Sequence, residues 1–197
     1  MTDSVTGQAT PTERPPGKRE RLVTAAAELL HQQGVERTTL AHMAMAANVP
    51  LGNVYYYFKT KDDVIAAVIE ERVRQMTTTL AAIDRRHRSP RERLKAFVRE
   101  ISSQSEIVAR YGCPLGSLCS ELDKRDSEPG LAVPELMRLP VEWAEEQFRS
   151  LGRRDARDLA LGLLAAYEGS ALLTNTMRDP SILHKTARHL RHWIDTL

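Results

Sequence analysis

Residues 38–61 read TTLAHMAMAANVPLGNVYYYFKTK, and this stretch decides the fold. Thr38 or Thr39 can cap a short helix, because a threonine hydroxyl accepts a hydrogen bond from the first amide groups of a helix. Asn48 then tolerates the positive φ that a tight turn requires. A second short helix is expected to begin near Pro50. Two short helices joined by a tight turn form the helix-turn-helix plan, whose second helix lies in the major groove of DNA.

Helical patterns flank this stretch on both sides. From Lys18, apolar residues recur three and four positions apart, as in an amphipathic helix, until Gly34, a residue that commonly ends helices. Thr60 and Asp63 form a capping box that predicts a long helix near 61–86. Further helices are expected at 90–108, 114–123, 131–150, 154–177 and 181–196. Because the period-two runs that indicate strands are nearly absent, the sequence predicts an all-α protein with about nine helices.

The composition of the chain limits its class. The 197 residues are 42% hydrophobic and 27% charged, which is typical of a soluble globular protein. Two cysteines cannot form the disulfide framework of a secreted domain, and no apolar run approaches the ~18–20 residues that span a bilayer. Residues 1–16 lack the hydrophobic core of a signal peptide and are expected to form a disordered tail. We therefore expect a cytoplasmic protein without membrane contact.

The segment GNVYYYFKTK, residues 52–61, carries a more specific signal. It resembles the end of the recognition helix of TetR-family (TetR/AcrR) transcriptional regulators, in which glycine, a small residue and an apolar residue precede Tyr-x-x-Phe-x-x-Lys. The resemblance covers residues 18–65. It implies a three-helix DNA-binding domain at 17–63, with the helix-turn-helix motif at about 39–58. It also implies a helical effector-binding and dimerisation domain at 64–197.

The candidate DNA-binding residues follow from the chemistry of the two short helices. Gly52 lets the backbone approach DNA closely, and Asn53 can hydrogen-bond a base edge or a phosphate. Three consecutive tyrosines point about 100° apart on a helix, so at least one or two phenols must project outward, toward phosphate oxygens. Lys59 and Lys61 are placed to bind phosphate. The full set is Thr38, Thr39, Leu40, Pro50, Leu51, Gly52, Asn53, Tyr55, Tyr56, Tyr57, Lys59 and Lys61.

The distribution of charge supports DNA binding only modestly. Residues 1–61 hold seven lysines or arginines against five acids, whereas residues 62–197 hold 21 of each. The basic residues just before or within the expected first helix, where they could meet phosphate, are Arg14, Lys18, Arg19 and Arg21. Pro50 and Leu51 stand where polar or basic residues are commoner in the family. They favour apolar contacts to thymine methyl groups.

The C-terminal part is expected to bind a small-molecule effector and to form a homodimer, mostly because of the resemblance. Since residues 62–197 carry no net charge, a hydrophobic or aromatic effector is expected over a strongly anionic one. Candidate ligand-binding residues, each of which taken alone is more typical of a core residue than of a ligand contact, are Phe97, Ile101, Tyr111, Cys113, Met137, Trp143, Phe148 and Tyr167. Small residues among leucines in the 154–177 helix allow close helix packing, within a dimer or within one core. The dimer-interface candidates are Leu159, Gly162, Leu163, Ala166, Gly169, Ser170 and Leu173.

The segment YGCPLGSL, residues 111–118, resembles the GCPxGSL segment of one subgroup of the family. Several members of that subgroup control drug-efflux or detoxification genes. Pro114 favours the first position of a helix, which places Cys113 at the N-cap, where the helix dipole favours a thiolate. Cys113 is therefore either a reactive sensor or effector contact, or a buried cysteine that packs as a small hydrophobic residue.

Enzyme functions have little support in the sequence. The histidines of the last expected helix, His184, His189 and His192, lack the HExxH spacing of a zinc site. Ser117 lacks a GxSxG elbow, and no phosphate-binding glycine fingerprint occurs. We expect no catalytic residue, no metal and no cofactor. The expected function is a regulator, in particular a repressor, that binds a pseudo-palindromic double-stranded operator. The alternatives are a TetR-like activator, and a small-molecule-binding protein or enzyme with a helix-turn-helix-like corner.

Overall fold

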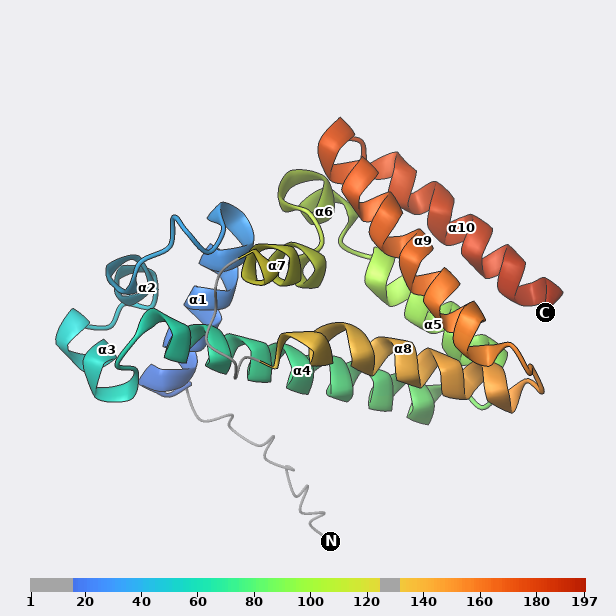
Figure 1. Ribbon diagram of the computed structural model, residues 1–197, viewed down its shortest axis with the longest axis horizontal. Coiled ribbons are helices and arrows are strands. Elements are labelled where there is room, and N and C mark those ends of the chain that lie inside the picture. The colour runs from blue at the N-terminus through green and yellow to red at the C-terminus, as the bar shows by residue number, and fades with distance from the viewer. Residues whose placement is uncertain (1–15, 125–131) are drawn as a thin grey trace, which may run out of the picture.

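The computed structural model describes residues 16–124 and 132–197, and within these ranges the chain forms ten helices and no strand. The helices are α1 (Lys18–Gln33), α2 (Leu40–Ala46), α3 (Leu51–Tyr57), α4 (Lys61–Arg86), α5 (Pro90–Ser102), α6 (Ser105–Tyr111), α7 (Pro114–Asp123), α8 (Val133–Ser150), α9 (Ala156–Met177) and α10 (Pro180–Thr196). Figure 1 shows α1–α3 at one end of the molecule and α9 and α10 toward the other, with α4 running between them. The all-α prediction is confirmed. Arg14 and all but the last residue of the expected 1–16 tail lie outside the described residues.

Local sequence signals set the ends of several helices. The Thr60 hydroxyl accepts a hydrogen bond from the backbone amide of Asp63, whose carboxylate accepts one from the Thr60 amide, so the expected capping box begins α4. Asn48 adopts a φ of 51° in the turn between α2 and α3, as expected. Gly34 ends α1 with a φ of 83°, and its amide donates to the carbonyl of Leu30.

The helix that the sequence predicts over residues 90–108 is interrupted, and this break accounts for the tenth helix. The Ser102 hydroxyl donates to the carbonyl of Val98, and the Ser103 hydroxyl donates to the carbonyl of Glu100. Serine hydroxyls that bond backbone carbonyls compete with the helical hydrogen-bond pattern and weaken it. The chain leaves α5 at this point and re-enters a helix as α6, which packs against α9.

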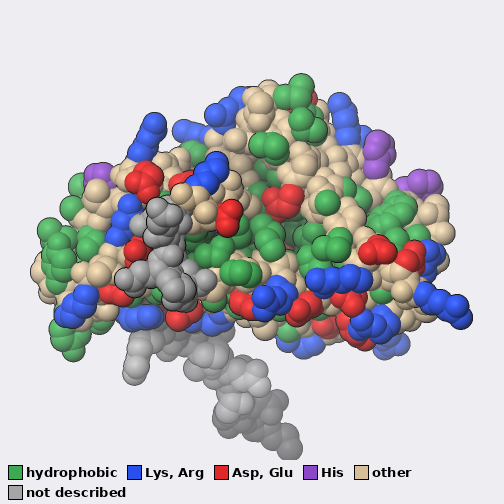
Figure 2. Space-filling view, in the orientation of Figure 1, with side chains coloured by type: hydrophobic (Ala, Val, Ile, Leu, Met, Phe, Trp, Pro, Cys, Tyr) green, Lys and Arg blue, Asp and Glu red, His purple; other side chains and the backbone are tan. Residues whose placement is uncertain are grey.

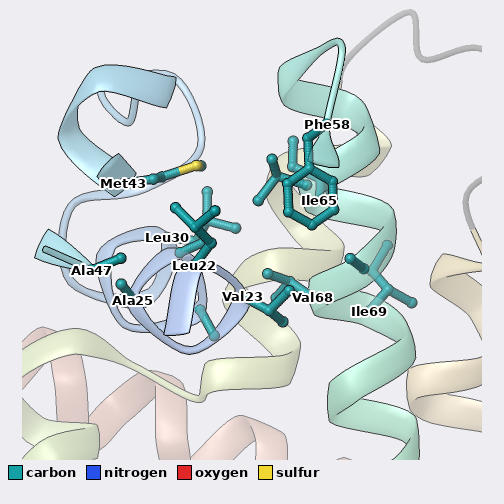
Figure 3. Packing of buried hydrophobic residues seen from close by; sticks show 14 of the residues in the cluster. Leu22, Val23, Ala25, Leu30, Met43, Ala47, Phe58, Ile65, Val68 and Ile69 are labelled. Atoms are coloured by element: carbon teal, nitrogen blue, oxygen red, sulfur yellow. The ribbon is translucent and has the colours of Figure 1, made fainter. Parts of the chain in front are cut away.

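One hydrophobic core joins α1, α2, α3 and the first half of α4. Figure 3 shows Leu22, Met43, Phe58 and Ile65 converging in this core, where each is almost completely buried. Three residues from later helices also belong to it, namely Leu118, Leu122 and Leu136. The N-terminal helices therefore share their core with α7 and α8, and the expected domain boundary after residue 63 falls inside α4.

A second core lies among the end of α4, α5, α8, α9 and α10. Its largest completely buried side chains include Phe97, Phe148, Leu163 and Ile194. Since a helix rises about 1.5 Å per residue, the 26 residues of α4 span roughly 39 Å and connect the two cores. Among the described helices, none is both long and apolar enough to cross a bilayer.

Candidate DNA-binding surface and ligand cavity

The tyrosines of α3 form an exposed aromatic surface. Tyr56 is 79% exposed, Tyr55 48% and Tyr57 37%, whereas Val54, the residue before them, is completely buried. The expectation that at least one or two phenols project outward is confirmed. The rings of Tyr56 and Tyr57 meet edge to face at 5.0 Å between centroids. Figure 2 shows hydrophobic side chains, a class that includes tyrosine there, at the end of the molecule formed by α2 and α3.

The residues at the beginning of α3 are also accessible. Pro50 and Gly52 are exposed, and Leu51 is 42% exposed. No atom lies within 4 Å of the position that a Cβ at Gly52 would take, so this part of the helix surface is open to a close approach. Asn53 is half-buried on the same helix. Thr39 caps α2 by accepting a hydrogen bond from the amide of His42 at 3.2 Å.

Thr38 has a different role from the one expected. Its side chain is completely buried. The hydroxyl donates to the carbonyl of Gly34 at 2.7 Å and accepts from the side-chain amide of Gln33 at 3.2 Å. These bonds fix the turn after α1, so Thr38 does not face DNA. Leu40 is half-buried and packs against the N-terminal core.

The basic residues near α3 divide between structural and accessible positions. The ammonium group of Lys59 donates to the carbonyl of Tyr55 at 2.7 Å, at the end of α3. Lys61 is the first residue of α4 and is half-buried. In α1, Lys18 is exposed, and the Arg19 guanidinium lies 5.3 Å from the centroid of the Phe58 ring.

Two accessible residues of α2 were not predicted from the sequence. His42 is exposed and Met45 is 78% exposed, next to the buried Met43 and Ala44. The sequence pattern could have predicted them, because residues that do not belong to the buried apolar face of a helix lie on its opposite, exposed face. They extend the accessible surface from α3 to α2.

A cavity of about 210 Å³ lies among α4, α5, α6, α7, α8 and α9. Five of the eight expected ligand-binding residues line it, namely Phe97, Ile101, Cys113, Met137 and Tyr167. The charged and amide side chains on its wall that sequence reasoning missed are Arg72, Gln75, Glu100, Gln104 and Glu168. The wall thus combines apolar side chains with a few polar groups, as small-molecule sites do.

The other three expected ligand-binding residues lie elsewhere. Tyr111 borders an open cleft, with its ring 5.7 Å from that of His31. The indole N–H of Trp143 donates to the carboxylate of Asp84 at 3.2 Å. Phe148 is completely buried in the second core. In this structure Trp143 and Phe148 pack and hydrogen-bond within the fold.

Residues of the segment 112–118 form part of the cavity wall. Glycine is favoured at two of its positions for different structural reasons. Gly112 has a φ of 85°, a conformation that favours glycine. A Cβ at Gly116 would overlap the carboxylate of Glu168, so the absence of a side chain there makes room for that group. Between them, Cys113 is the N-cap of α7 and accepts a hydrogen bond from the Gly116 amide at 3.4 Å.

Cys113 occupies the expected N-cap position, and of the two alternatives its surroundings oppose the thiolate. Burial raises the pKa of Cys113 to about 12, with a further contribution from the nearby carboxylate of Glu168. The thiol donates to that carboxylate at 3.2 Å, and the Tyr167 hydroxyl lies 3.9 Å from the sulfur. Burial also raises the pKa of Glu168 above its ordinary value. The dipole of α7 is therefore outweighed, and the structure supports the interpretation of Cys113 as a packing residue.

Contacts from α1 connect the N-terminal helices to this segment. Nε2 of His31 lies 2.9 Å from the carbonyl oxygen of Gly112, next to Cys113 in the cavity wall. The backbone amide of Val35 donates to the carboxylate of Glu121 at 2.5 Å, so the end of α1 is also bound to α7. Burial, more than any other effect, lowers the pKa of His31 below its ordinary value.

The outward face of α9 is apolar and lacks cover from the described residues of the chain. Of the expected dimer residues, Gly162, Ala166, Gly169 and Leu173 are exposed, whereas Leu163 and Ser170 are buried and Leu159 is half-buried. The last three therefore pack within one protomer. Sequence reasoning missed three large residues of the exposed face, namely Leu161, Leu172 and Met177, which are 46%, 67% and 64% exposed.

Metal ligands are not clustered in the parts of the chain that the structure describes, where no group of three or more histidine, cysteine or acidic residues could hold an ion. The histidines of α10 lie along its surface, all three exposed. His184 is within hydrogen-bonding distance of the Ser105 hydroxyl, at 2.9 Å.

Comparisons with known proteins agree with this arrangement. The family described as "Bacterial regulatory proteins, tetR family" matches residues 22–68, which run from α1 into α4. The transcriptional regulator BetI of Paraburkholderia phymatum is 29% identical to this chain, over 91% of this chain and 92% of its own length. The regulator LmrA of Bacillus subtilis is 27% identical, over 84% of this chain and 91% of its own length.

Solved structures share the fold of nearly the whole chain. A TetR transcriptional regulator from Legionella pneumophila superposes with a TM-score of 0.80 and 22% identity, covering 92% of this chain and 97% of that one. Reduced NemR of E. coli superposes with a TM-score of 0.74 and 20% identity, covering 88% of this chain and 95% of that one. Residues 22–68 therefore form a helix-turn-helix DNA-binding domain of the tetR-family type, which presents the exposed α3, and the chain is a DNA-binding transcriptional regulator, as its relatives over nearly their full length are.

Proposed function

We propose that the protein is a homodimeric repressor that binds a pseudo-palindromic operator and leaves it when a small molecule enters the cavity. The exposed surface of α3 carries the DNA-binding part of this proposal. Its phenols reach phosphate oxygens, while Leu51 and Asn53 face base edges in the major groove. Because it binds DNA, the protein would act in the cytoplasm.

Dimerisation through α9 and α10 is supported by the apolar outward face of α9. Leu172, Leu173 and Met177 expose more than half of their surface, and Gly162 and Gly169 leave room for a second helix to approach. A two-fold dimer presents two copies of α3, and the operator must then repeat its half-sites with the same symmetry. In B-DNA such half-sites lie about 34–36 Å apart, or a multiple of that distance.

Release follows from the position of the cavity beside the contacts to α1. Cys113, Pro114 and Leu115 form part of the cavity wall, and the preceding Gly112 is bound to His31. A ligand that displaces this wall moves α1 and the α3 helix packed on it. The ligand thus favours a conformation in which the two copies of α3 no longer match the half-site spacing. The mostly apolar wall suits a hydrophobic or aromatic ligand. Pockets for drug-sized ligands measure about 300–1,000 Å³, so this cavity suits a smaller molecule.

The resemblance of residues 112–118 to the GCPxGSL subgroup extends this proposal to the regulated genes. We infer that they serve drug efflux or detoxification. A regulator of such genes needs a cavity that accepts foreign small molecules, and the cavity beside Cys113 meets that requirement.

The DNA-binding role can be tested with a duplex of arbitrary sequence. Lys61→Ala removes a cation that we place against phosphate, so affinity should fall for every duplex. The slope of log affinity against log salt concentration should become less steep by about one unit. Lys124→Ala removes an equally charged, exposed side chain at the end of α7 and should leave both unchanged. Fluorescence anisotropy over a range of salt concentrations measures both quantities. An unaltered salt slope for Lys61→Ala would show that Lys61 does not contact phosphate.

A further inference from the structure

We infer that the cavity selects small organic cations, because Glu168 presents a carboxylate to it that the described residues do not pair with a basic side chain. This inference rests on the proposed effector role of the cavity and gives the chemical class of the effector. Leu164, Tyr167 and Glu168 lie three and four positions apart on α9 and line the same wall.

The immediate surroundings of Glu168 are poor in compensating groups. Its hydrogen-bond donor among the described residues is the Cys113 thiol, at 3.2 Å, which is a weak donor. Gly116 makes room for the carboxylate without contributing a side chain. Burial raises the pKa of Glu168, which means that its charged form gains less from its present neighbours than it would from water. A cation in the cavity would supply the missing partner.

The other charged groups of the wall do not cancel this preference. Arg72 donates to Gln75 at 3.3 Å, and its charge is attracted by Glu28 of α1, which lies outside the cavity lining. Glu100 is exposed and adds a second negative charge to the lining. With Cys113 and Tyr167 neutral, the three charged side chains Arg72, Glu100 and Glu168 therefore give the wall a net charge of −1.

The three classes of ligand differ in what they do to Glu168. An anion would be repelled, and a neutral apolar molecule would remove water from the carboxylate without replacing its hydrogen bonds. A cation gains Coulomb energy in a site of low dielectric constant, and the phenol ring of Tyr167 beside it adds cation–π attraction. The apolar remainder of the wall, which includes Phe97 and Met137, accepts the body of the ligand.

Two probes of the same shape separate charge from size. Benzyltrimethylammonium and 2,2-dimethylpropylbenzene differ in that a positively charged nitrogen replaces a carbon atom. Isothermal titration of the full-length protein without DNA should show about tenfold tighter binding of the cation. Equal affinities for the two probes, or no binding of the cation at millimolar concentration, would overturn the inference.

Substitutions assign the preference to one carboxylate. Glu168→Gln should remove the preference for the cation, by weakening its binding and easing the desolvation cost that the neutral probe meets, whereas Glu168→Asp should retain part of the preference. Glu106→Gln removes the same charge from the exposed surface of α6, outside the cavity lining, and should behave like wild type. A preference for the cation that persists in Glu168→Gln would contradict the assignment. Thermal unfolding of each variant establishes that it is folded.

The DNA-release step is measured separately, so that the two proposals can fail independently. If the cation binds in a Glu168-dependent way but leaves a protein–DNA complex intact, the ligand class stands and the effector role fails. If the neutral probe binds as tightly as the cation and releases DNA, the effector role stands and the ligand class fails.

Discussion

Cys113 lies at the N-cap of α7, where the helix dipole favours a thiolate, but it is also buried beside the carboxylate of Glu168. The two effects act in opposite directions on its pKa. A helix dipole acts mainly within the first turn and contributes at most a few kcal/mol, whereas burial of a charged group costs more than that unless the charge is paired. The charged group beside Cys113 is the carboxylate of Glu168, which repels a thiolate instead of pairing with it. The thiol therefore stays protonated.

The thiols should therefore react slowly with alkylating reagents at neutral pH. The pKa of Cys113 is about 12 and that of Cys119 about 11, raised in both cases mainly by burial. A free cysteine has a pKa of about 8.5. Alkylation rates against pH in Cys113→Ser and Cys119→Ser isolate each thiol, and Cys119, the less buried one, should react faster. A thiol in Cys119→Ser that titrates near or below 8.5 would contradict this account of Cys113.

His31 makes the stability of the contact between α1 and Gly112 depend on pH. Its pKa is lower in the folded protein than the ordinary 6.5, because of burial and the nearby Arg72, while the bond to Gly112 acts in the opposite direction. The unfolded chain then binds more protons than the folded one, so stability rises with pH in this window. The contribution of His31 is complete above about pH 6.5 and is lost as the pH falls through its lowered folded value.

Urea unfolding of wild type and His31→Gln, at about pH 7.5 and about pH 5, tests this prediction. Wild type should lose more stability than His31→Gln on acidification, because glutamine does not take up a proton. The comparison cancels the contributions of Glu168 and the other titrating groups. A loss of equal size in both proteins would show that His31 has the same pKa in the folded and unfolded states.

At the residue scale, the sequence predicted which interactions a side chain can make better than it predicted which way that side chain points. Thr38 and Thr39 both fit an N-cap, and the structure is needed to show that Thr39 caps α2 while Thr38 is buried against Gly34. Glu168 carries no motif, and its meaning depends on Gly116, which is 52 positions away in the sequence. Such pairs are set by tertiary packing, which a local pattern does not contain.

Among the elements, α9 has two faces with different partners. Tyr167, Ser170 and Ala171 face the interior, while Gly162 and Gly169 face outward with no atom within 4 Å of a possible Cβ. The spacing of small residues and leucines predicted a packing helix correctly. It could not decide which face packs within the protomer, because leucine occurs on both faces, as the buried Leu163 and the exposed Leu172 show.

Gly169→Leu tests the outward face of α9 as an interface. A Cβ at this exposed position meets no atom within 4 Å, and leucine favours the helix by roughly 1 kcal/mol relative to glycine, so the monomer fold should be preserved. Across a closely packed interface the same side chain overpacks the contact. The variant should sediment as a monomer or aggregate and bind operator DNA poorly.

Ser120→Leu, which introduces the same side chain at an exposed position of α7, serves as the control and should remain dimeric. A wild-type protein that sediments as a monomer at micromolar concentration would contradict the dimer. An unchanged dimer in Gly169→Leu would instead move the interface away from this face.

Across the whole molecule, function depends on connections that join distant parts of the chain. The helix α4 contributes Ile65 to the N-terminal core and Leu80 to the second core, and α7 packs on α1 through Leu118 and Leu122. The number and class of the helices follow closely from caps and periodicity. The cavity, which six helices form together, does not, because no segment of the sequence contains more than a few of its residues.

The central claim is that a symmetric dimer reads DNA through two copies of α3. Selection of duplexes from a random pool by the wild-type protein, followed by sequencing, tests it most directly. The account predicts enrichment of inverted repeats whose half-sites are centred one helical turn, about 10 base pairs, or a multiple of it apart. Asn53→Ala should select a different half-site. A pool that shows no enriched sequence, or enriched single sites without an inverted repeat, would contradict the claim.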